Sequence, residues 1–218
     1  AKKAPGIMKV PNALDVSETD RLRGKLTVIP MRGWQRSMRW PETGLKWVPT
    51  SQYIQDFGSV VGYPMSGLGT YLGKFSHGIG KYYPFRGISH PKIRSAALAK
   101  ILNARRMPGM NFRVVEVPGK NGKKATGLYA EVTDYDAWRP TELNFHLMQL
   151  ACRYDGKNPF SAASSSQERG FLIHMGSTAF FEALKRDGAG VDVAGYLREW
   201  EAKSRIYQQQ SRKFWLYQ

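Results

Sequence analysis

The sequence predicts an α+β fold, with a mixed or antiparallel sheet flanked by helices. Helix-like and strand-like segments both occur, and they do not alternate in the order that builds a parallel sheet. A long region rich in glycine, proline and aromatic residues, 33–92, shows no helical periodicity outside 51–61, and we expect it to be an ordered loop region. The 218 residues are 42% hydrophobic, which is enough for one substantial core.

The N-terminal part of the chain is predicted to be irregular. Residues 1–25 contain two prolines and little apolar periodicity, so we assign them to an extended arm or linker and residues 26–218 to the α+β domain. Within that domain the run LTVIPM (26–31) is rich in β-branched residues, which is typical of a short strand.

The second half of the chain shows stronger local patterns. The segment 93–106 predicts an amphipathic helix whose apolar face consists of Ile93, Ala97, Ile101 and Ala104. The segments 111–118 and 126–134, joined by the turn sequence GKNGKKA, predict a β-hairpin.

Three further helices are expected towards the C-terminus. One begins near Thr141, with an apolar face that includes Leu143 and Leu147, and His146 beside them is expected to be a core or boundary residue. The other two have Ser177 and Asp192 as N-caps and run to about Arg186 and towards Tyr207. The serine-rich stretch SAASSS (161–166) is expected to be a flexible polar loop.

The composition indicates a polyanionic partner. Lys and Arg number 33 against 17 Asp and Glu, so the formal charge is +16. Nucleic acid, anionic lipid and other anionic polymers are the usual partners of such a protein. The cations are spread from residue 2 to 213, which favours a broad charged surface over a charged tail. No run approaches the ~18 apolar residues of a membrane span.

Two features bear on the compartment. Cys152 is the only cysteine and lies on an apolar helix face, so we expect a buried structural thiol and no disulfide framework. The chain begins with Ala1, so we expect either a processed product that has lost a signal peptide or a fragment that has lost an upstream domain.

Motifs for cofactors and metals fail on spacing. The glycines of GLGTYLG (67–73) and HGIGK (77–81) do not match a dinucleotide fingerprint or a phosphate-binding P-loop. The four histidines are far apart in sequence, and no G-x-S-x-G motif is present. We therefore predict no cofactor and no metal.

The stretch FSHGIGKYYPFRG (75–87) combines three glycines with rings and cations. No Asp or Glu occurs between Asp56 and Glu116, so this region cannot supply the carboxyl pair that glycoside hydrolysis requires. Its rings and cations could instead hold a sugar, a base or an acidic group. In the alternative interpretation, Tyr82, Pro84 and Phe85 pack inward and only Lys81 and Arg86 meet solvent.

Five segments in order resemble a known family: LTVIPMRGWQRSMRWPETGLKWVPTS (26–51), YP (63–64), SHGIGKYYPF (76–85), YAEVTDYDAWRP (129–140) and REWEAKSRIYQQQSRKFWLY (198–217). Together they are similar to the C-terminal half of the exo-β-N-acetylmuramidase (NamZ-like) family. The resemblance implies a peptidoglycan-related protein of the periplasm or cell envelope. Members cleave N-acetylmuramic acid from glycan ends in a cleft that also needs an N-terminal Rossmann-like domain, and its FGPEHG segment does not occur in this chain.

The resemblance also identifies 75–87 as the counterpart of the family's active-site loop. Its two family glutamates correspond to His77 and Arg86, its arginine corresponds to Ile79, and a further glutamate corresponds to Arg32. The ligand-binding candidates are therefore His77, Lys81, Tyr82, Tyr83, Arg86 and Arg32. Gly78, Gly80 and Pro84 are retained as loop-shaping residues, and no residue is assigned as catalytic.

Three functions are compatible with this pattern. The favoured hypothesis is a non-catalytic envelope protein that binds peptidoglycan fragments or another anionic polymer, or that serves as a subunit beside other proteins. The first alternative is a fragment or split half of an active exo-β-N-acetylmuramidase. The second is a protein that binds nucleic acid or belongs to a ribonucleoprotein, which would be cytoplasmic and whose binding would weaken steeply with salt.

Overall fold

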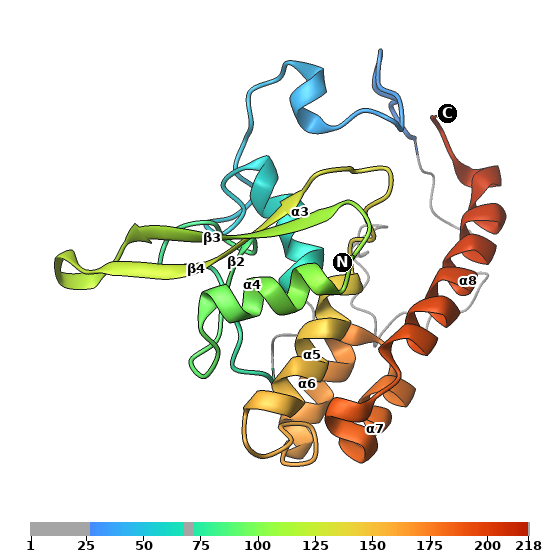
Figure 1. Ribbon diagram of the computed structural model, residues 1–218. Coiled ribbons are helices and arrows are strands. Elements are labelled where there is room, and N and C mark those ends of the chain that lie inside the picture. The colour runs from blue at the N-terminus through green and yellow to red at the C-terminus, as the bar shows by residue number, and fades with distance from the viewer. Residues whose placement is uncertain (1–26, 68–71, 218) are drawn as a thin grey trace, which may run out of the picture. The chain divides into compact units, whose positions relative to one another are not determined.

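The computed structural model in Figure 1 describes residues 27–67 and 72–217. The chain divides into two compact units, one bounded by Ala1–Met38 and Phe214–Gln218 and the other by Arg39–Lys213. The predicted arm, 1–25, lies outside the described residues. No described helix has the length and apolar character needed to cross a membrane.

The first unit brings its two chain segments together through polar and aromatic contacts. The guanidinium carbon of Arg36 lies 3.7 Å from the ring centre of Trp215. The backbone N–H of Met31 donates to the hydroxyl of Tyr217 at 2.6 Å. The prediction of a strand at 26–31 is wrong for its described residues, 27–31, which pair with no strand and have no regular structure.

The larger unit has the predicted α+β architecture, with one antiparallel sheet of four strands in the order β1-β2-β4-β3. The strands are β1 (Ser76–His77), β2 (Gly87–Ser89), β3 (Met110–Pro118) and β4 (Lys124–Val132). The predicted hairpin is confirmed as β3 and β4, paired from Met110↔Val132 to Pro118↔Lys124. Its turn, η2 (Lys120–Gly122), has Asn121 at φ 55°, a conformation that asparagine tolerates better than most residues.

Helix α4 (Ser95–Ala104) packs against β3 and β4 (Figure 1). The predicted helix is confirmed, and its predicted apolar face is right for Ile93, which is buried, and Ile101, which packs against the core, but wrong for the two alanines. Leu98 and Leu102 are fully buried, whereas Ala97 and Ala104 are exposed. The larger side chains occupy the core because burying a leucine removes much more apolar surface from water than burying an alanine.

Helix α5 (Glu142–Tyr154) begins next to Thr141, as predicted, and is the central element of the unit. One of its faces joins α3 (Phe57–Ser66), α4 and the sheet in a core that contains Leu143 and Leu147. The other face carries Phe145 and Met148 into a second core with the C-terminal helices. His146 is 7% exposed, so the prediction of a core or boundary histidine is confirmed.

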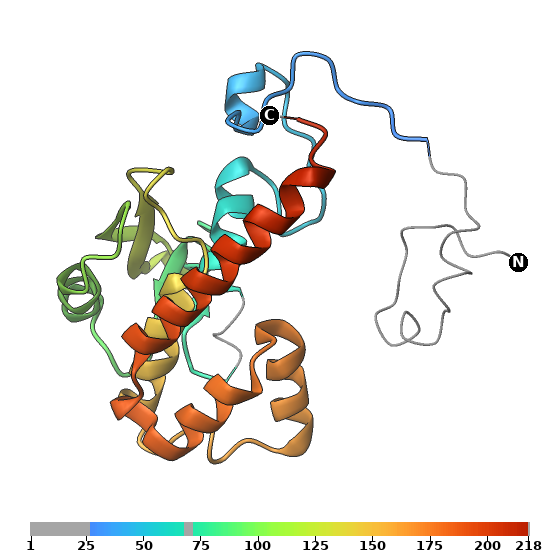
Figure 2. The same cartoon turned by 90° about the vertical axis from the view of Figure 1, so that its right-hand side faces the viewer.

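The C-terminal helices are α6 (Ser165–Met175), α7 (Thr178–Asp187) and α8 (Val193–Ser211), which follow α5 as Figure 2 shows. Ser177 and Asp192 are N-caps of α7 and α8, as predicted. The prediction of a flexible loop at SAASSS is wrong for its last residues, because Ser164 forms a capping box with Gln167 that starts α6. Short 3-10 turns complete the fold: η1 (Trp40–Thr43), η3 (Gly188–Gly190) and η4 (Arg212–Phe214).

Candidate functional site

A cavity of about 840 Å³ lies against the loop 76–85 in the larger unit. Three parts of the chain form its walls: the segment 52–55, the loop itself, and the ends of β2 and β4. The lining residues are Gln52, Tyr53, Gln55, Ser76, His77, Gly78, Ile79, Gly80, Lys81, Pro84, Phe85, Ser89, Ala125 and Thr126. None of these described lining residues is acidic.

The loop folds into a tight turn between Ile79 and Tyr82. The N–H of Ile79 donates to the carbonyl of Tyr82 at 2.9 Å, and the N–H of Tyr82 donates back at 3.0 Å. Gly80 has φ +59°, so this position needs a left-handed conformation that glycine adopts without strain. The turn places Lys81 at its tip, and the ammonium of Lys81 lies 5.7 Å from the ring centre of Tyr82.

Ile79 anchors the loop to the sheet. Its side chain is 3% exposed and packs with Val115 and Val117 of β3. A Cβ added at Gly87 or Gly127 would lie 2.8 Å or 2.6 Å from the Ile79 side chain, so both glycines make room for it. Ile79 therefore has a packing role that the comparison with a family arginine did not reveal.

The second half of the loop is strained on both sides of Pro84. Tyr83 has φ 51° and Phe85 has φ 60°, values that are uncommon for residues other than glycine. Buried contacts hold this geometry, because Phe85 is 9% exposed and its carbonyl accepts a hydrogen bond from the hydroxyl of Ser66 at 2.6 Å. Strain of this kind is found most often at binding and catalytic sites.

His77 faces the cavity from β1. Its ring stacks on Phe85, with ring centres 5.3 Å apart and planes at 11°. Burial of one side of the ring lowers the pKa of His77 from its usual value of 6.5, so the imidazole is neutral at pH 7. Beside it, the hydroxyls of Ser76 and Ser89 form a hydrogen bond of 2.6 Å across the β1–β2 pair.

Arg86 does not line the cavity. The alternative interpretation placed it in solvent, and that prediction is wrong. Arg86 is 7% exposed, and its Nε donates to the carbonyl of Ala130 at 2.7 Å. Its guanidinium lies 4.6 Å from the ring centre of Tyr129, and that of Arg113 lies 4.7 Å from the same ring. The ring of Tyr83 also contacts the ring of Tyr129 edge-on, with ring centres 5.0 Å apart. Tyr83 is not among the residues that line the cavity.

The structure thus brings together only part of the predicted set. His77, Lys81, Gly78, Gly80 and Pro84 line the cavity. Tyr82 is half-buried and packs against the β3–β4 hairpin, as the alternative interpretation expected. Arg32 belongs to the smaller unit, whereas the described lining residues all belong to the larger one.

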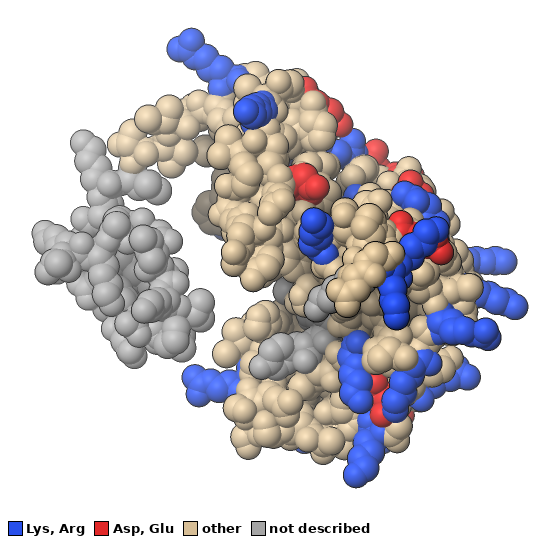
Figure 3. Space-filling model, turned by 90° about the vertical axis from the view of Figure 1, so that its left-hand side faces the viewer, with Lys and Arg blue, Asp and Glu red and all other residues tan. Residues whose placement is uncertain are grey.

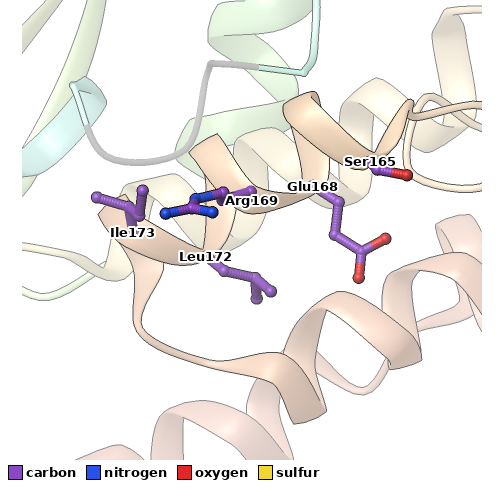
Figure 4. A pocket seen from close by; sticks show the side chains of 5 residues that line it. All are labelled: Ser165, Glu168, Arg169, Leu172 and Ile173. Atoms are coloured by element: carbon purple, nitrogen blue, oxygen red, sulfur yellow. The ribbon is translucent and has the colours of Figure 1, made fainter. Parts of the chain in front are cut away.

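A second pocket of about 480 Å³ lies along α6. Figure 4 shows that its side chains all project from this one helix: Ser165, Glu168, Arg169, Leu172 and Ile173. Side chains from one helix do not converge on a ligand from several sides. The cavity at the loop 76–85 is therefore the better candidate site.

Comparison with known proteins identifies the family. The profile described as "Exo-beta-N-acetylmuramidase NamZ, C-terminal" matches residues 61–217, and the one described as "Exo-beta-N-acetylmuramidase NamZ, N-terminal" matches residues 11–58. The chain belongs to the NamZ family. The resemblance of its sequence motifs to the NamZ-like family is thereby confirmed.

Two relatives of this NamZ-family chain are informative. The peptidoglycan beta-N-acetylmuramidase NamZ of Bacillus subtilis (strain 168) is 31% identical over 130 residues, which cover 57% of this chain and 31% of the relative. A crystal structure of a DUF1343 family protein from Bacteroides fragilis NCTC 9343 matches with a TM-score of 0.72 and 27% identity, covering 85% of this chain and 49% of that one. This chain thus spans about a third to half of their length.

The N-terminal match reaches into a segment whose motifs resemble the C-terminal half of the family. Residues 11–58 match the N-terminal profile, and they include the motif segment 26–51. The two profiles meet between 58 and 61, so Gln52, Tyr53 and Gln55 of the cavity fall in the N-terminal match. In this NamZ-family chain, the cavity is lined by residues from both sides of the point where the profiles meet.

Sequence reasoning missed several lining residues. Gln52, Tyr53 and Gln55 lie in the stretch WVPTSQYIQDFG (47–58), for which the sequence predicted no ligand-binding residue. Thr126 lies on β4 and reaches the cavity through the pairing of β4 with β2. The local sequence offers one signal for this wall of the cavity. The polar and aromatic segment 52–55 directly precedes Asp56, the N-cap of α3.

Proposed function

We propose that this NamZ-family chain binds the N-acetylmuramic acid end of peptidoglycan glycan in the cavity and does not hydrolyse it. The single observation that carries the proposal is the lining of the cavity, which combines hydroxyl, amide, imidazole and ammonium groups with no described carboxyl group. Family membership supplies the class of ligand. The proposal gives the chain a role in the cell envelope.

The proposed lack of hydrolysis follows from the chemistry of glycosidic bonds. Hydrolysis in most glycosidases uses one carboxylic acid to protonate the leaving oxygen and one carboxylate on the other face of the sugar. His77 is neutral at pH 7 because burial lowers its pKa, so it can accept a proton but cannot stabilise a developing positive charge as a carboxylate does. Lys81 would oppose that charge.

The same groups suit a sugar that carries an acid. Hydroxyl and amide groups of Ser89, Gln52 and Gln55 match the sugar hydroxyls and the N-acetyl group, which both donate and accept hydrogen bonds. The ring of Tyr53 is 62% exposed and can lie against a pyranose face. Lys81 at the turn tip can pair with the lactyl carboxylate of muramic acid. A volume of about 840 Å³ is in the usual range for small-ligand sites.

Binding can be measured by titration calorimetry with the disaccharide of N-acetylmuramic acid and N-acetylglucosamine. We expect Lys81→Gln and Tyr53→Ala each to weaken binding by about tenfold, a loss of about 1.4 kcal/mol. Lys123→Gln is the matched control, because Lys123 is exposed on the β3–β4 turn and does not line the cavity. Equal effects of Lys81→Gln and Lys123→Gln would contradict binding at the loop.

Active hydrolysis is the competing function, and one observation favours it. The chain spans only about a third of its Bacillus subtilis relative, so carboxyl groups from another chain could complete the cavity. Release of free N-acetylmuramic acid by this chain alone would contradict the proposal. Release only after addition of a second chain with the missing part would support a split enzyme.

A further inference from the structure

Two groups of cations in the larger unit differ in their partners. Those around the C-terminal helices are paired with acids: Lys185 with Glu182 at 3.1 Å, and Arg186 with Asp187 at 2.6 Å. On α8, Lys203 and Arg205 pair with glutamates one turn earlier. In each of these four pairs the two charges neutralise each other.

A second group of cations lies along α4 and the C-terminal end of α5. Its members are the described residues Lys92, Arg94, Lys100, Arg105, Arg106, Arg153 and Lys157, and we call this group the α4–α5 basic seam. In the described part of the chain, none of the seven forms an ion pair with an acidic side chain. These seven positive charges thus have no acidic side chain paired with them.

Contacts between the two helices hold the seam together. At one end, the ammonium of Lys92 donates to the backbone carbonyl of Asp155 at 2.9 Å. At the other end, a guanidinium nitrogen of Arg105 lies 3.3 Å from Nδ1 of His146. The N-terminal end of α4 therefore lies at the C-terminal end of α5. Figure 3 shows many Lys and Arg side chains along one side of the molecule, with acidic side chains at several places between them.

The nearest acidic groups are engaged inside the protein. The carboxylate of Asp155 is 4% exposed and bonds to His90. The carboxylate of Glu142 is 8% exposed and lies 3.8 Å from Arg139 and 3.6 Å from His146. Neither carboxylate pairs with a cation of the seam, so these cations remain open to an anionic partner.

Arg105 and Arg153 show the effect of this imbalance. Burial and the nearby charge of Arg153 both lower the pKa of Arg105. Two guanidinium groups that repel each other become stabilised when an anion lies between them. Phosphate oxygens fit this role well, since a guanidinium can bind two of them at once.

We propose that the α4–α5 basic seam is a binding surface for single-stranded nucleic acid, separate from the glycan cavity. Four of its seven cations are arginines, which bind phosphates and also stack on flat rings. The molecule already uses such stacking, since the guanidinium carbon of Arg153 lies 5.6 Å from the ring centre of Tyr154. A polyol phosphate offers charge but no ring. The observations therefore favour nucleic acid over an anionic envelope polymer.

The test compares two triple variants of the full chain, each lacking three charges. Arg94→Gln, Lys100→Gln and Arg153→Gln change the seam, whereas Lys185→Gln, Lys203→Gln and Arg205→Gln change paired cations elsewhere. Binding of a labelled single-stranded RNA of about 20 nucleotides is measured by fluorescence anisotropy from about 50 to 200 mM salt. We expect the seam variant to bind at least tenfold more weakly and to have a salt slope smaller by about 2.

The control variant should retain affinity within about threefold of the parent chain. Circular dichroism melting checks that both variants fold, and all three changed seam residues are exposed or at a helix cap. Equal losses in the two variants, or no RNA binding at low salt, would overturn the proposal. So would equal competition by poly(glycerol phosphate), because the surface would then recognise charge alone. If the parent chain bound RNA but no glycan, the result would contradict the proposed function of the cavity and would leave the proposal for the seam intact.

Discussion

Nε2 of His90 lies 2.9 Å from Oδ1 of Asp155, and the two side chains are 0% and 4% exposed. Nδ1 of His90 accepts a hydrogen bond from the backbone N–H of Lys92 at 3.2 Å, so the ring proton resides on Nε2. The N–H at Nε2 therefore donates to the carboxylate of Asp155. This buried bond ties the start of α4 to the end of α5 and fixes the geometry of the basic seam.

Removing one member of this pair should destabilise the fold. His90→Leu leaves the buried carboxylate of Asp155 without its donor, and we expect a loss of about 3 kcal/mol in the free energy of unfolding. Asp155→Asn keeps an acceptor for His90 and should cost only about 1 kcal/mol. Urea unfolding measures both values. A His90→Leu protein as stable as the parent would show that the bond contributes nothing to the fold.

The two loop glycines should differ in their tolerance of a side chain. Gly80 has φ +59°, so Gly80→Ala should cost about 1–2 kcal/mol of stability and weaken glycan binding. Gly78 is outside the left-handed region, and an added Cβ would make only ordinary contacts, with the carbonyl oxygens of Gly80 at 3.7 Å and Tyr82 at 3.8 Å. Gly78→Ala should therefore be nearly neutral. Thermal melts of the two variants provide the comparison, and similar melting temperatures would refute the assigned turn.

Cys152 should be unreactive in the folded protein. Burial, followed by the negative charge of Asp155, raises the pKa of its thiol to about 12. At about pH 8 the thiolate fraction is then only about one in ten thousand, so alkylation by iodoacetamide should be about a thousand times slower than for an exposed cysteine. Mass spectrometry follows the reaction. Rapid labelling without denaturant would disprove the predicted buried thiol.

His77 should make stability depend on pH. Burial lowers its pKa below the unfolded value of 6.5, so the unfolded state binds more protons just below pH 6.5. The stability contribution is complete above this pH and is lost as the pH falls through 6.5 towards the folded pKa. Urea midpoints of the parent should therefore fall more steeply over this window than those of His77→Gln. Parallel slopes would show that the ring is not desolvated.

The sequence was most informative where local chemistry decides structure. Ser177 and Asp192 cap their helices because a side-chain oxygen accepts from a backbone N–H three residues later, which depends on neighbouring residues alone. The β3–β4 hairpin is similarly local. The buried face of α4 was predicted only in part, because its alanines suit either face, and the packing of Leu98 and Leu102 against the sheet decides the orientation.

The candidate site was only partly predictable for the same reason. Lys81 and His77 were found from the loop, but Tyr53 joins them through tertiary folding that no local pattern encodes. Arg86 reads as a surface cation in the sequence, yet the ring of Tyr129 and the carbonyl of Ala130 hold its guanidinium inside. The buried role of Ile79 depends on Gly87 and Gly127, which are distant from the turn.

The most direct test of the central claim combines binding and turnover in one experiment. The chain is titrated with the muramyl disaccharide over concentrations that span the dissociation constant of the parent chain, and mass spectrometry follows both the complex and any free N-acetylmuramic acid. The account predicts a complex that Lys81→Gln weakens by about tenfold, with no release of the sugar. Release of free N-acetylmuramic acid by this chain alone, or an unchanged complex with Lys81→Gln, would contradict it.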